Sequence, residues 1–342
     1  MLRVGMIGCG EIAVANARSI NNAQNACIAM AMDVVADVAK DIGEKYNASY
    51  TTDVKELLAN PDVDAVIISV PHYLHAPLAI QAAEAGKHVM VEKPIAINLK
   101  QADEMIAACE KAGVLLSVCF VSRYGASTVK AKELIEQGAI GKIIGIKISG
   151  MSNKPEHYWH GGYSGRVKTD WRQQLDKSGG GYLIMNLVHN IDRLRYITGL
   201  EAVRVYSEYD TFVTPVEVED MLNVVIRYNN GAIGSIDGSS CAAGGESLGD
   251  RIYGTEGQIV CSNPLRVYTT KSVEGLNTHE WNQLKVEEPY DSRVRFIEEF
   301  AETVSRCSGQ PPITGYDGRA TLEIIVAAYE SGKRKAVVEL PM

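Results

Sequence analysis

The sequence lacks the paired cysteines of a disulfide framework or of a zinc site. Its seven cysteines are odd in number, scattered along the chain and never spaced as CxxC. This usage indicates reduced thiols and predicts a cytoplasmic protein. No apolar run approaches the ~18 residues of a membrane-spanning helix, so we expect no membrane contact. Glu11 interrupts the apolar start of the chain and no small-residue cleavage site follows, so we interpret the start as a strand rather than a signal peptide.

An excess of basic residues is also missing. The chain of 342 residues has 34 lysines and arginines against 42 aspartates and glutamates, a net charge of −8 at pH 7. An acidic chain without a basic block is not typical of proteins whose main partner is nucleic acid or an anionic membrane. Apolar residues make up 46% of the chain, which is enough to bury a core in each of about two domains.

The first third of the chain alternates short apolar runs with helical patterns. We predict strands over Leu2–Ile7, Cys27–Met32, Ala65–Val70, His88–Val91 and Val114–Cys119. Helices are predicted between them, over Ala13–Ile20, Val35–Tyr46, Val54–Ala59, Ala76–Ala85 and Leu99–Ala112. This alternation predicts a doubly wound parallel sheet, with helices on both sides, over residues 1–121.

The pattern changes after about Phe120. Longer alternating runs predict strands over Ile143–Ser149, Ala202–Tyr209, Leu222–Tyr228, Ala232–Gly238, Ser247–Tyr253 and Gln258–Cys261. Asn229-Asn230-Gly231 is typical of a hairpin turn. Helices are predicted over Ser127–Gln137, Tyr182–Thr198, Val294–Arg306 and Arg319–Ser331. Residues 122–342 are therefore expected to form an α+β domain with an open, mostly antiparallel sheet, which makes the whole chain α/β.

A glycine-rich turn joins the first strand to the first helix. Gly8-Cys9-Gly10-Glu11-Ile12-Ala13 fits G-x-G-x-x-(G/A), in which Gly8 permits the tight turn and Gly10 lets the backbone approach a pyrophosphate. Asp33 ends the second strand 20 residues after Ala13, where a carboxylate binds the adenosine ribose. No cation for a 2′-phosphate follows it, so the sequence predicts NAD over NADP. The alternative is a plain glycine turn with a solvated aspartate.

Lys93 follows the predicted strand His88–Val91. Ligands bind at the carboxyl ends of strands in parallel sheets. A lysine there suits acid–base chemistry or a hydrogen bond to a substrate hydroxyl. The alternative is a surface pair of Glu92 and Lys93 before a turn proline.

Several stretches recur together in a pattern that covers nearly the whole chain. They are Val70–Ala76, Gly86–Val89, Glu92-Lys93-Pro94, Ser178–Gly181 leading to His189 and Asp192, Asp317–Ala320 and Ala327–Gly332. The combination resembles the Gfo/Idh/MocA family of glucose–fructose oxidoreductase and inositol dehydrogenase. The resemblance implies an NAD(P)-binding Rossmann domain and a C-terminal domain that binds substrate. It also implies a homodimer or homotetramer through the open sheet, and oxidation or reduction of a sugar, glycoside or cyclitol.

The resemblance also implies roles for single residues. Lys93 matches a lysine placed between nicotinamide and substrate, and His189 matches a histidine that accepts a proton. His72 stands where the family has an asparagine after Pro71. The residues expected around the cofactor are Gly8, Gly10, Glu11, Ile12, Asp33, Val70, Pro71, His72, His75, Glu92 and Lys93.

One position departs from the family pattern. Many members carry an aspartate four residues before the histidine, where this chain has Met185 followed by Asn186. Asparagine can hold His189 or the substrate, but it carries no negative charge. We therefore expect Lys93 to take more of the proton transfer.

An aromatic and basic segment, residues 157–172, is expected to select the substrate. Aromatic faces suit a sugar ring, and arginines suit a carboxylate or phosphate. The alternative is a loop packed against a neighbouring subunit. His157 and His160 are spaced like metal ligands but no third ligand is evident, so no metal is expected. The expected substrate residues are Arg123, Tyr158, Trp159, Tyr163, Arg166, Asp170, Trp171, Arg172, Asn186 and His189.

Three functions are compatible with these features. The first is an NAD-dependent oxidoreductase that moves hydride between nicotinamide and a secondary alcohol or ketone of a sugar, glycoside or cyclitol, with Lys93 and His189 handling the proton. The second is an NAD-assisted glycoside lyase or hydrolase that oxidises its substrate transiently. The third, motivated by Met185, is a non-catalytic regulator that binds NAD or a sugar, and the presence of both Lys93 and His189 makes it the least favoured.

Overall fold

Six short strands form a parallel sheet in the N-terminal part of the chain. Their order is β3-β2-β1-β4-β5-β6, and every neighbouring pair is parallel. The strands are β1 (Leu2–Ile7), β2 (Ala26–Met32), β3 (Ser49–Thr51), β4 (Ala65–Ile68), β5 (His88–Val91) and β6 (Leu116–Val118). The winding reverses between β1 and β4, so the predicted doubly wound Rossmann sheet is confirmed. The periodicity does not predict β3, whose three residues are too few to show a pattern.

Helices connect successive strands of this sheet. They are α1 (Glu11–Asn22), α2 (Ala36–Lys45), α3 (Val54–Ala59), η1 (His72–Leu74), α4 (His75–Glu84), α5 (Leu99–Ala112) and η2 (Val121–Tyr124). Asp53 and Asn98 cap α3 and α5 with their side chains, and Gly113 ends α5 in the left-handed conformation. The helix ends are thus determined by residues whose local chemistry suits a cap.

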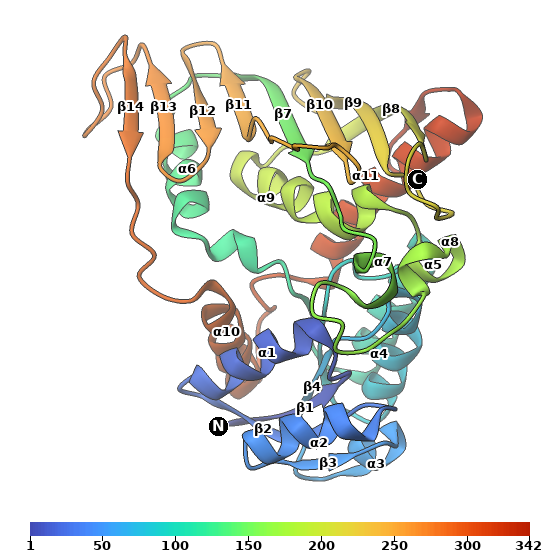
Figure 1. Cartoon of the computed structure of the whole chain (residues 1–342). Coiled ribbons are helices and arrows are strands. Elements are labelled where there is room, and N and C mark those ends of the chain that lie inside the picture. Colours follow the sequence, from blue (N-terminus) through green and yellow to red (C-terminus); the bar gives the residue numbers. More distant parts are fainter. The chain divides into compact units, whose positions relative to one another are not determined.

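Two later segments of the chain belong to the same unit as this sheet. The computed structural model describes all 342 residues, and the first of its two units comprises Met1–Val121, Pro155–Gly180 and Tyr290–Leu322. In the last segment, α10 (Ser292–Arg306) packs beside α1 (Figure 1). The Asn25 side chain donates a hydrogen bond of 2.9 Å to the Glu298 carbonyl. The sequence predicts two consecutive domains, 1–121 and 122–342, whereas both units of the structure are discontinuous in sequence.

Nine strands form the sheet of the second unit, which comprises Ser122–Lys154, Gly181–Pro289 and Glu323–Met342. Their order is β14-β13-β12-β11-β7-β10-β9-β8-β15. The strands are β7 (Ile143–Met151), β8 (Ala202–Asp210), β9 (Met221–Tyr228), β10 (Ile233–Ser239), β11 (Asp250–Gly254), β12 (Gly257–Cys261), β13 (Leu265–Thr269), β14 (Trp281–Leu284) and β15 (Val338–Glu339). Only β7 and β10 pair in parallel, so the predicted open, mostly antiparallel sheet is confirmed.

One face of this sheet is covered by helices. Figure 1 shows α6 (Ala126–Glu136) and α9 (Val188–Thr198) against the row of strands, and both contact it. Apolar side chains such as Val205, Val224 and Ile236 are buried on the strands. The predicted hairpin turn at residues 229–231 joins β9 to β10. The sequence analysis does not predict β13, β14 or β15. The strand β14 is polar, and β15 has only two residues.

The helix that carries His189 begins with a π turn. Leu183–Leu187 is π-helical and continues directly into α9, where the sequence predicts a single α-helix over Tyr182–Thr198. Single π turns within helices are frequent at functional sites. The last helix, α11 (Gly315–Arg334), has its first residues in the first unit and its last residues in the second.

Glu219, which is buried before β9, holds the start of the π turn. One carboxylate oxygen accepts the N–H of Gly181 at 2.6 Å. The other accepts the N–H of Leu183 at 2.9 Å and the hydroxyl of Tyr329 at 3.0 Å. A Cβ on Gly181 would overlap with the Glu219 carbonyl, so this position requires glycine. Burial raises the pKa of Glu219 to about 7, although the three donors act in the opposite direction.

We predict that Glu219→Ala lowers the free energy of unfolding by about 2–4 kcal/mol, because two buried N–H groups lose their acceptor. Thermal and denaturant unfolding measure the loss, with Glu246→Ala on an exposed loop as the control. A pKa raised by folding favours the protonated carboxyl, so the contribution of Glu219 to stability decreases as the pH rises through about 7. The loss is therefore expected to be larger near about pH 5 than near about pH 8. A variant as stable as the control would contradict the anchoring role.

Candidate active site

Three strand ends meet at one edge of the parallel sheet. The register pairs Ile7 with Ile68 and Ile68 with Val91. The residues that follow these strands therefore lie next to one another: Gly8 after β1, Ser69–Pro71 after β4, and Glu92 with Lys93 after β5. Because the winding reverses between β1 and β4, this is the edge at which a doubly wound sheet binds a dinucleotide.

The turn after β1 is shaped by two glycines. Gly8 has a φ of +93°, and a Cβ on it would lie 2.5 Å from the Ser69 carbonyl oxygen, so only glycine fits. A Cβ on Gly10 would meet no atom within 4 Å, so the space beside its backbone is open. Gly10 is also the N-cap of α1 and offers no side-chain acceptor. The N–H groups of the first helical turn can therefore bind an anion, and the turn fits the pyrophosphate of a dinucleotide.

Asp33, at the end of β2, faces the same turn. Its Oδ2 accepts the N–H of Cys9 at 2.7 Å, and its Oδ1 accepts the N–H of Val35 at 2.9 Å. Each carboxylate oxygen retains a lone pair for a ribose hydroxyl. Val34 and Val35 beside it are exposed and provide no positive charge for a 2′-phosphate. The site therefore fits NAD.

Glu92, the residue before Lys93, is buried, and two side chains hold its carboxylate in place. Its Oε1 accepts the Asn16 amide at 3.1 Å and the Arg293 guanidinium at 2.9 Å. Asn16 also donates to the Ser69 hydroxyl at 2.9 Å and accepts from Arg293 at 2.6 Å. The network joins α1, α10 and the ends of β4 and β5. Neither Asn16 nor Arg293 is predicted; Asn16 carries a signal, as a polar residue on the core face of a helix, whereas Arg293 carries none.

His72 is buried in the first unit on the loop after β4. Its Nδ1 lies 2.8 Å from the carbonyl oxygen of Ser178, and its ring centre lies 4.4 Å from that of Trp171. Burial lowers the pKa of His72 well below its usual value, and the positive charge of Lys93 acts in the same direction. The ring is therefore neutral at physiological pH and joins the strand-end loop to the segment 155–180.

His75 is buried between the two loops that flank Lys93. Its Nδ1 lies 2.8 Å from the Pro94 carbonyl oxygen, and its Nε2 lies 3.0 Å from that of Val70. Burial lowers the pKa of His75, although both carbonyls and Glu92 favour its charged form. Both ring nitrogens are directed at protein carbonyls, so His75 positions these loops.

Two residues predicted to contact the substrate also contact the glycine-rich turn. The guanidinium of Arg166 donates to the Cys9 carbonyl at 2.8 Å and pairs with Asp41 at 2.6 Å. The backbone N–H of Tyr163 donates to the Glu11 carboxylate at 3.1 Å. The contacts of these two residues within the first unit are thus made with the cofactor turn and α2.

The other aromatic residues of the segment differ in exposure. Tyr158 and Trp159, in α7 (Tyr158–Gly161), are buried and meet edge to face at 5.4 Å. Arg172, in η3 (Trp171–Gln173), lies over the rings of Tyr158 and Trp171 at 5.1 and 4.7 Å. Asp170 is exposed and bonds to side chains within its own segment, which continues into α8 (Leu175–Ser178). Arg172 and Trp171 therefore connect the segment to the strand-end loops through His72.

In the second unit, Asn186 and His189 lie about one turn apart on the helix anchored by Glu219. Both are partly exposed, whereas Met185 is buried. Asn186 Oδ1 has no hydrogen-bond partner within the protein, so it can accept a hydrogen bond from a ligand. The position at which an aspartate is expected is thus filled by an apolar core residue, and Asn186 is the polar neighbour of His189.

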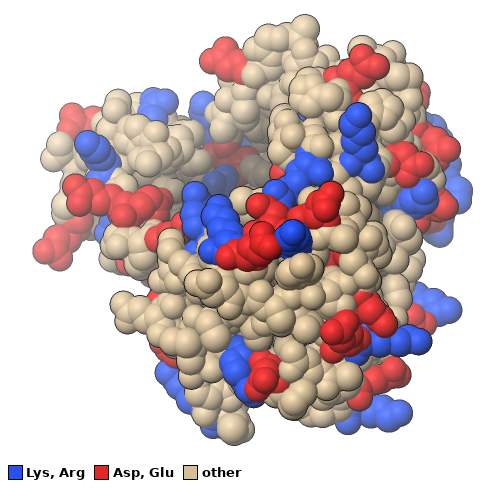
Figure 2. All heavy atoms as spheres, turned by 60° about the horizontal axis from the view of Figure 1, so that its bottom comes forward, with Lys and Arg blue, Asp and Glu red and all other residues tan.

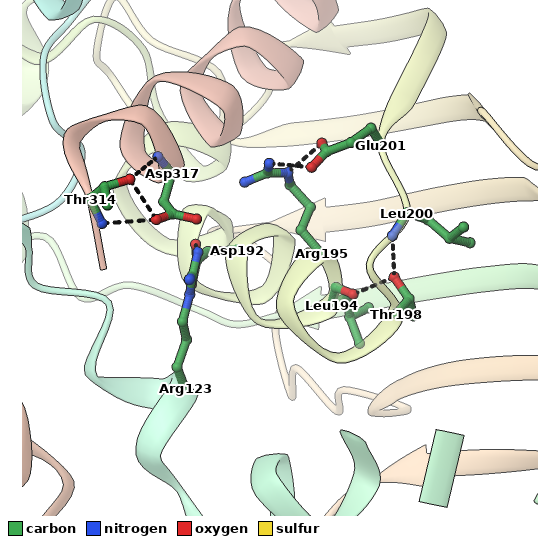
Figure 3. Close-up of polar contacts among 9 residues, drawn as sticks. All are labelled: Arg123, Asp192, Leu194, Arg195, Thr198, Leu200, Glu201, Thr314 and Asp317. Carbon is green, nitrogen blue, oxygen red and sulfur yellow. Dashed lines mark hydrogen bonds and ion pairs between the residues drawn. The ribbon is translucent and has the colours of Figure 1, made fainter. Parts of the chain in front are cut away.

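Arg123 forms a buried ion pair with Asp192 of α9 (Figure 3). Two hydrogen bonds of 2.8 and 2.6 Å join the guanidinium to the two carboxylate oxygens. This bidentate geometry is among the strongest available to charged side chains. The guanidinium also lies 5.2 Å from the ring centre of Tyr196. Arg123, predicted to border the substrate, is therefore directed at the helix that carries His189.

On the face in Figure 2, lysines and arginines are interspersed with aspartates and glutamates. No group of three or more His, Cys, Asp or Glu side chains is arranged to hold a metal ion, and His157 and His160 are both exposed. The structure contains no helix with both the length and the hydropathy of a membrane span.

Known proteins match the chain along its whole length. The family described as an oxidoreductase family with an NAD-binding Rossmann fold, GFO_IDH_MocA, matches residues 2–120, and the GFO/IDH/MocA C-terminal domain matches residues 128–260. Myo-inositol 2-dehydrogenase of Thermotoga maritima is 30% identical over 99% of this chain and 98% of its own. The structure of levoglucosan dehydrogenase in complex with NADH has a TM-score of 0.86 at 25% identity, covering 100% of this chain and 99% of its own. That of the WlbA dehydrogenase from Bordetella pertussis with NADH and UDP-GlcNAcA has a TM-score of 0.84 at 25% identity and the same coverage.

These matches agree with the geometry of the first unit. The glycine turn, the open N-terminus of α1 and Asp33 form a dinucleotide site, and the matched Rossmann model contains all of them. The C-terminal match covers the helix with Asn186 and His189 and most of the nine-stranded sheet. The family resemblance of the sequence is confirmed: the chain belongs to the Gfo/Idh/MocA family of NAD-binding oxidoreductases.

Proposed function

We propose that this protein is an NAD-dependent dehydrogenase acting on a secondary alcohol, or the matching ketone, of a sugar, glycoside or cyclitol. The observation that carries the proposal is the position of Lys93 at the carboxyl end of β5, on the same sheet edge as the dinucleotide turn. The buried network around Glu92 supports it, because this network immobilises the backbone that carries Lys93. Relatives named for inositol and levoglucosan oxidation support the substrate class.

The chain must hold the substrate and manage one proton. Bound NAD supplies the hydride acceptor at C4 of nicotinamide. As the carbinol C–H bond breaks, the hydroxyl proton has to pass to a base, and Lys93 or His189 accepts it. Lys93 also holds the substrate oxygen, and Asn186 Oδ1 accepts a hydrogen bond from a further hydroxyl. Because Met185 supplies no negative charge next to His189, we assign the larger share of the proton transfer to Lys93.

The free thiols support a cytoplasmic location for this enzyme. All seven cysteines are unpaired in the structure. Burial raises the pKa of Cys9 and of Cys109 to about 12, so neither is a reactive thiolate. Unpaired cysteines are typical of a reducing compartment.

The proposed dehydrogenase should form NADH from NAD when it meets its substrate. A panel of inositols, pyranoses, glycosides and anhydrosugars tests this by absorbance, with NADP in parallel. We expect turnover with at least one compound and a clear preference for NAD, because the Asp33 carboxylate repels a 2′-phosphate. Release of an aglycone without net NADH would instead favour the NAD-assisted lyase or hydrolase. Tight NAD binding with no reaction across the panel would favour a regulator.

Lys93→Ala should lower kcat by roughly 10²–10⁴-fold, the usual contribution of a positioned acid–base group. NADH binding, followed by fluorescence titration, should change little, because the phosphate turn and Asp33 are untouched. Lys100→Ala on exposed α5 is the matched control. Normal turnover in Lys93→Ala would remove this residue from the mechanism.

We also infer that a second copy of the chain covers the outer face of the nine-stranded sheet. Tyr206, Val225 and Ile233 are exposed there, on three adjacent strands. The register places Tyr206 opposite Val225, and these residues line a shallow groove with Arg204 and Arg227. Exposed apolar side chains on neighbouring strands are typical of a subunit contact. This supports a homodimer or homotetramer through the C-terminal sheet.

Val225→Glu should shift the protein to a smaller species. A carboxylate on this face would be buried against its symmetry mate, and like charges would face each other across a two-fold axis. Light scattering coupled to gel filtration measures the molar mass. Leu248→Glu, on an exposed loop of the same unit, controls for added charge. An unchanged mass in both variants would place the subunit contact elsewhere.

A further inference from the structure

Residues 162–166 form a strap across the glycine-rich turn. On one side, the backbone N–H groups of Tyr163 and Ser164 donate to the Glu11 carboxylate at 3.1 Å. On the other side, Arg166 Nε donates to the Cys9 carbonyl at 2.8 Å. Cys9 and Glu11 flank Gly10, whose backbone fits the pyrophosphate. The strap is therefore attached on both sides of the phosphate position.

The contact with Glu11 depends on a glycine in the strap. Gly162 has a φ of +71°, which side chains rarely adopt, and a Cβ there would overlap with Glu11 Oε2. The backbone conformation therefore favours glycine, and a side chain here would displace the Glu11 carboxylate. The strap also contains Gly165, with a φ of +62°, but a Cβ on that residue would meet nothing within 4 Å. Both glycines have a positive φ, but Gly162 is buried against Glu11 whereas Gly165 is exposed.

Arg166 makes the second attachment and extends it to α2. Its Nη2 pairs with Asp41 at 2.6 Å and approaches the Val38 carbonyl at 3.4 Å. The turn that binds phosphate and the helix that follows β2 are thereby held by one side chain. Most of the strap is exposed, so its hydrogen bonds compete with water and can open while the fold stays intact.

The charge of Glu11 couples the strap to the cofactor. Glu11 is the first residue of α1, next to the helix N-terminus at which a pyrophosphate would bind. A free carboxylate there would repel the phosphates and compete for the same N–H groups. In the strap, two N–H groups of another segment satisfy this carboxylate. Closing the strap and binding the dinucleotide therefore favour each other, and such coupling is reciprocal.

We propose that this strap is a clasp on the bound dinucleotide, and that Glu11 and Arg166 are positioning residues that set the rate at which NADH leaves. The clasp retains the cofactor between hydride transfers and opens by losing the contacts of Glu11 and Arg166. The proposal depends on NAD binding, which defines the family, and not on the identity of the substrate. It can therefore be tested, and can fail, independently of the proposed dehydrogenase activity.

The test compares Gly162→Ala with Gly165→Ala in the full-length protein. Both place an alanine at a positive φ in the strap, but only the first puts a methyl group where the Glu11 carboxylate lies and so breaks this contact. NADH release is followed by stopped-flow fluorescence after the NADH complex is mixed with excess NAD. We expect Gly162→Ala to release NADH about tenfold faster, the change that follows from losing charge-assisted hydrogen bonds. Gly165→Ala should stay close to wild type.

Arg166→Gln keeps the proposal open to contradiction if Gly162→Ala misfolds, and a double-mutant cycle adds a second test if it folds. Arg166→Gln should also speed NADH release, because it loses the Asp41 pair. In a double-mutant cycle, Glu11→Ala combined with Gly162→Ala should release NADH no faster than either single variant, since both break the same contact. The melting temperature without cofactor should change little in Arg166→Gln and Glu11→Ala, because both side chains are partly exposed. Release at the wild-type rate in Gly162→Ala and Arg166→Gln would overturn the clasp.

Discussion

A buried carboxylate, Glu92, determines the geometry on which the first unit depends. Its position at the end of β5 is fixed by Asn16 of α1 and Arg293 of α10, elements that are far apart in sequence. Removing one partner of a buried ion pair leaves an uncompensated charge and is strongly destabilising. Lys93, the dinucleotide turn and the loop after β4 therefore share one support. The backbone of Lys93, the residue assigned to the chemistry, is thus supported through its neighbour in sequence.

Three glutamates with different exposure to solvent each accept hydrogen bonds from another segment of the chain. Glu92 and Glu219 are buried and accept hydrogen bonds from α1 and from the start of the π turn, respectively. Glu11 is half-buried and accepts two N–H groups from the strap. Burial makes an unsatisfied donor expensive, so the first two contacts are permanent. The third is close to solvent, so it can be reversible. All three contacts have the same chemistry. Their different exposure to solvent decides which of them are permanent and which can open.

The sequence predicts what is encoded locally. Apolar periodicity identifies the Rossmann strands, and the glycine turn with Asp33 identifies the cofactor site, because each signal lies within a short stretch. Arg166 and Arg123 show the limit: both are predicted to be near the substrate, but their ion pairs are not predicted. Arg166 pairs with Asp41, 125 residues away, and Arg123 with Asp192, 69 residues away. Glu219 is likewise 38 residues from the glycine it holds. Partners at such separations leave no local pattern, and only folding brings them together.

The discontinuous first unit affects how relatives can be recombined. Residues 1–121 contain the whole parallel sheet, yet α1 packs on α10, and Cys9 and Glu11 bond to the strap. A chimera that exchanges residues 1–121 alone would replace α1 but keep α10, and would replace Cys9 and Glu11 but keep the strap. Both contacts would then join residues from different proteins. The natural module for transplanting cofactor handling has three pieces, with 155–180 and 290–322 travelling alongside the sheet. The residues that form and support the nucleotide site are thus distributed over three separate stretches of the sequence.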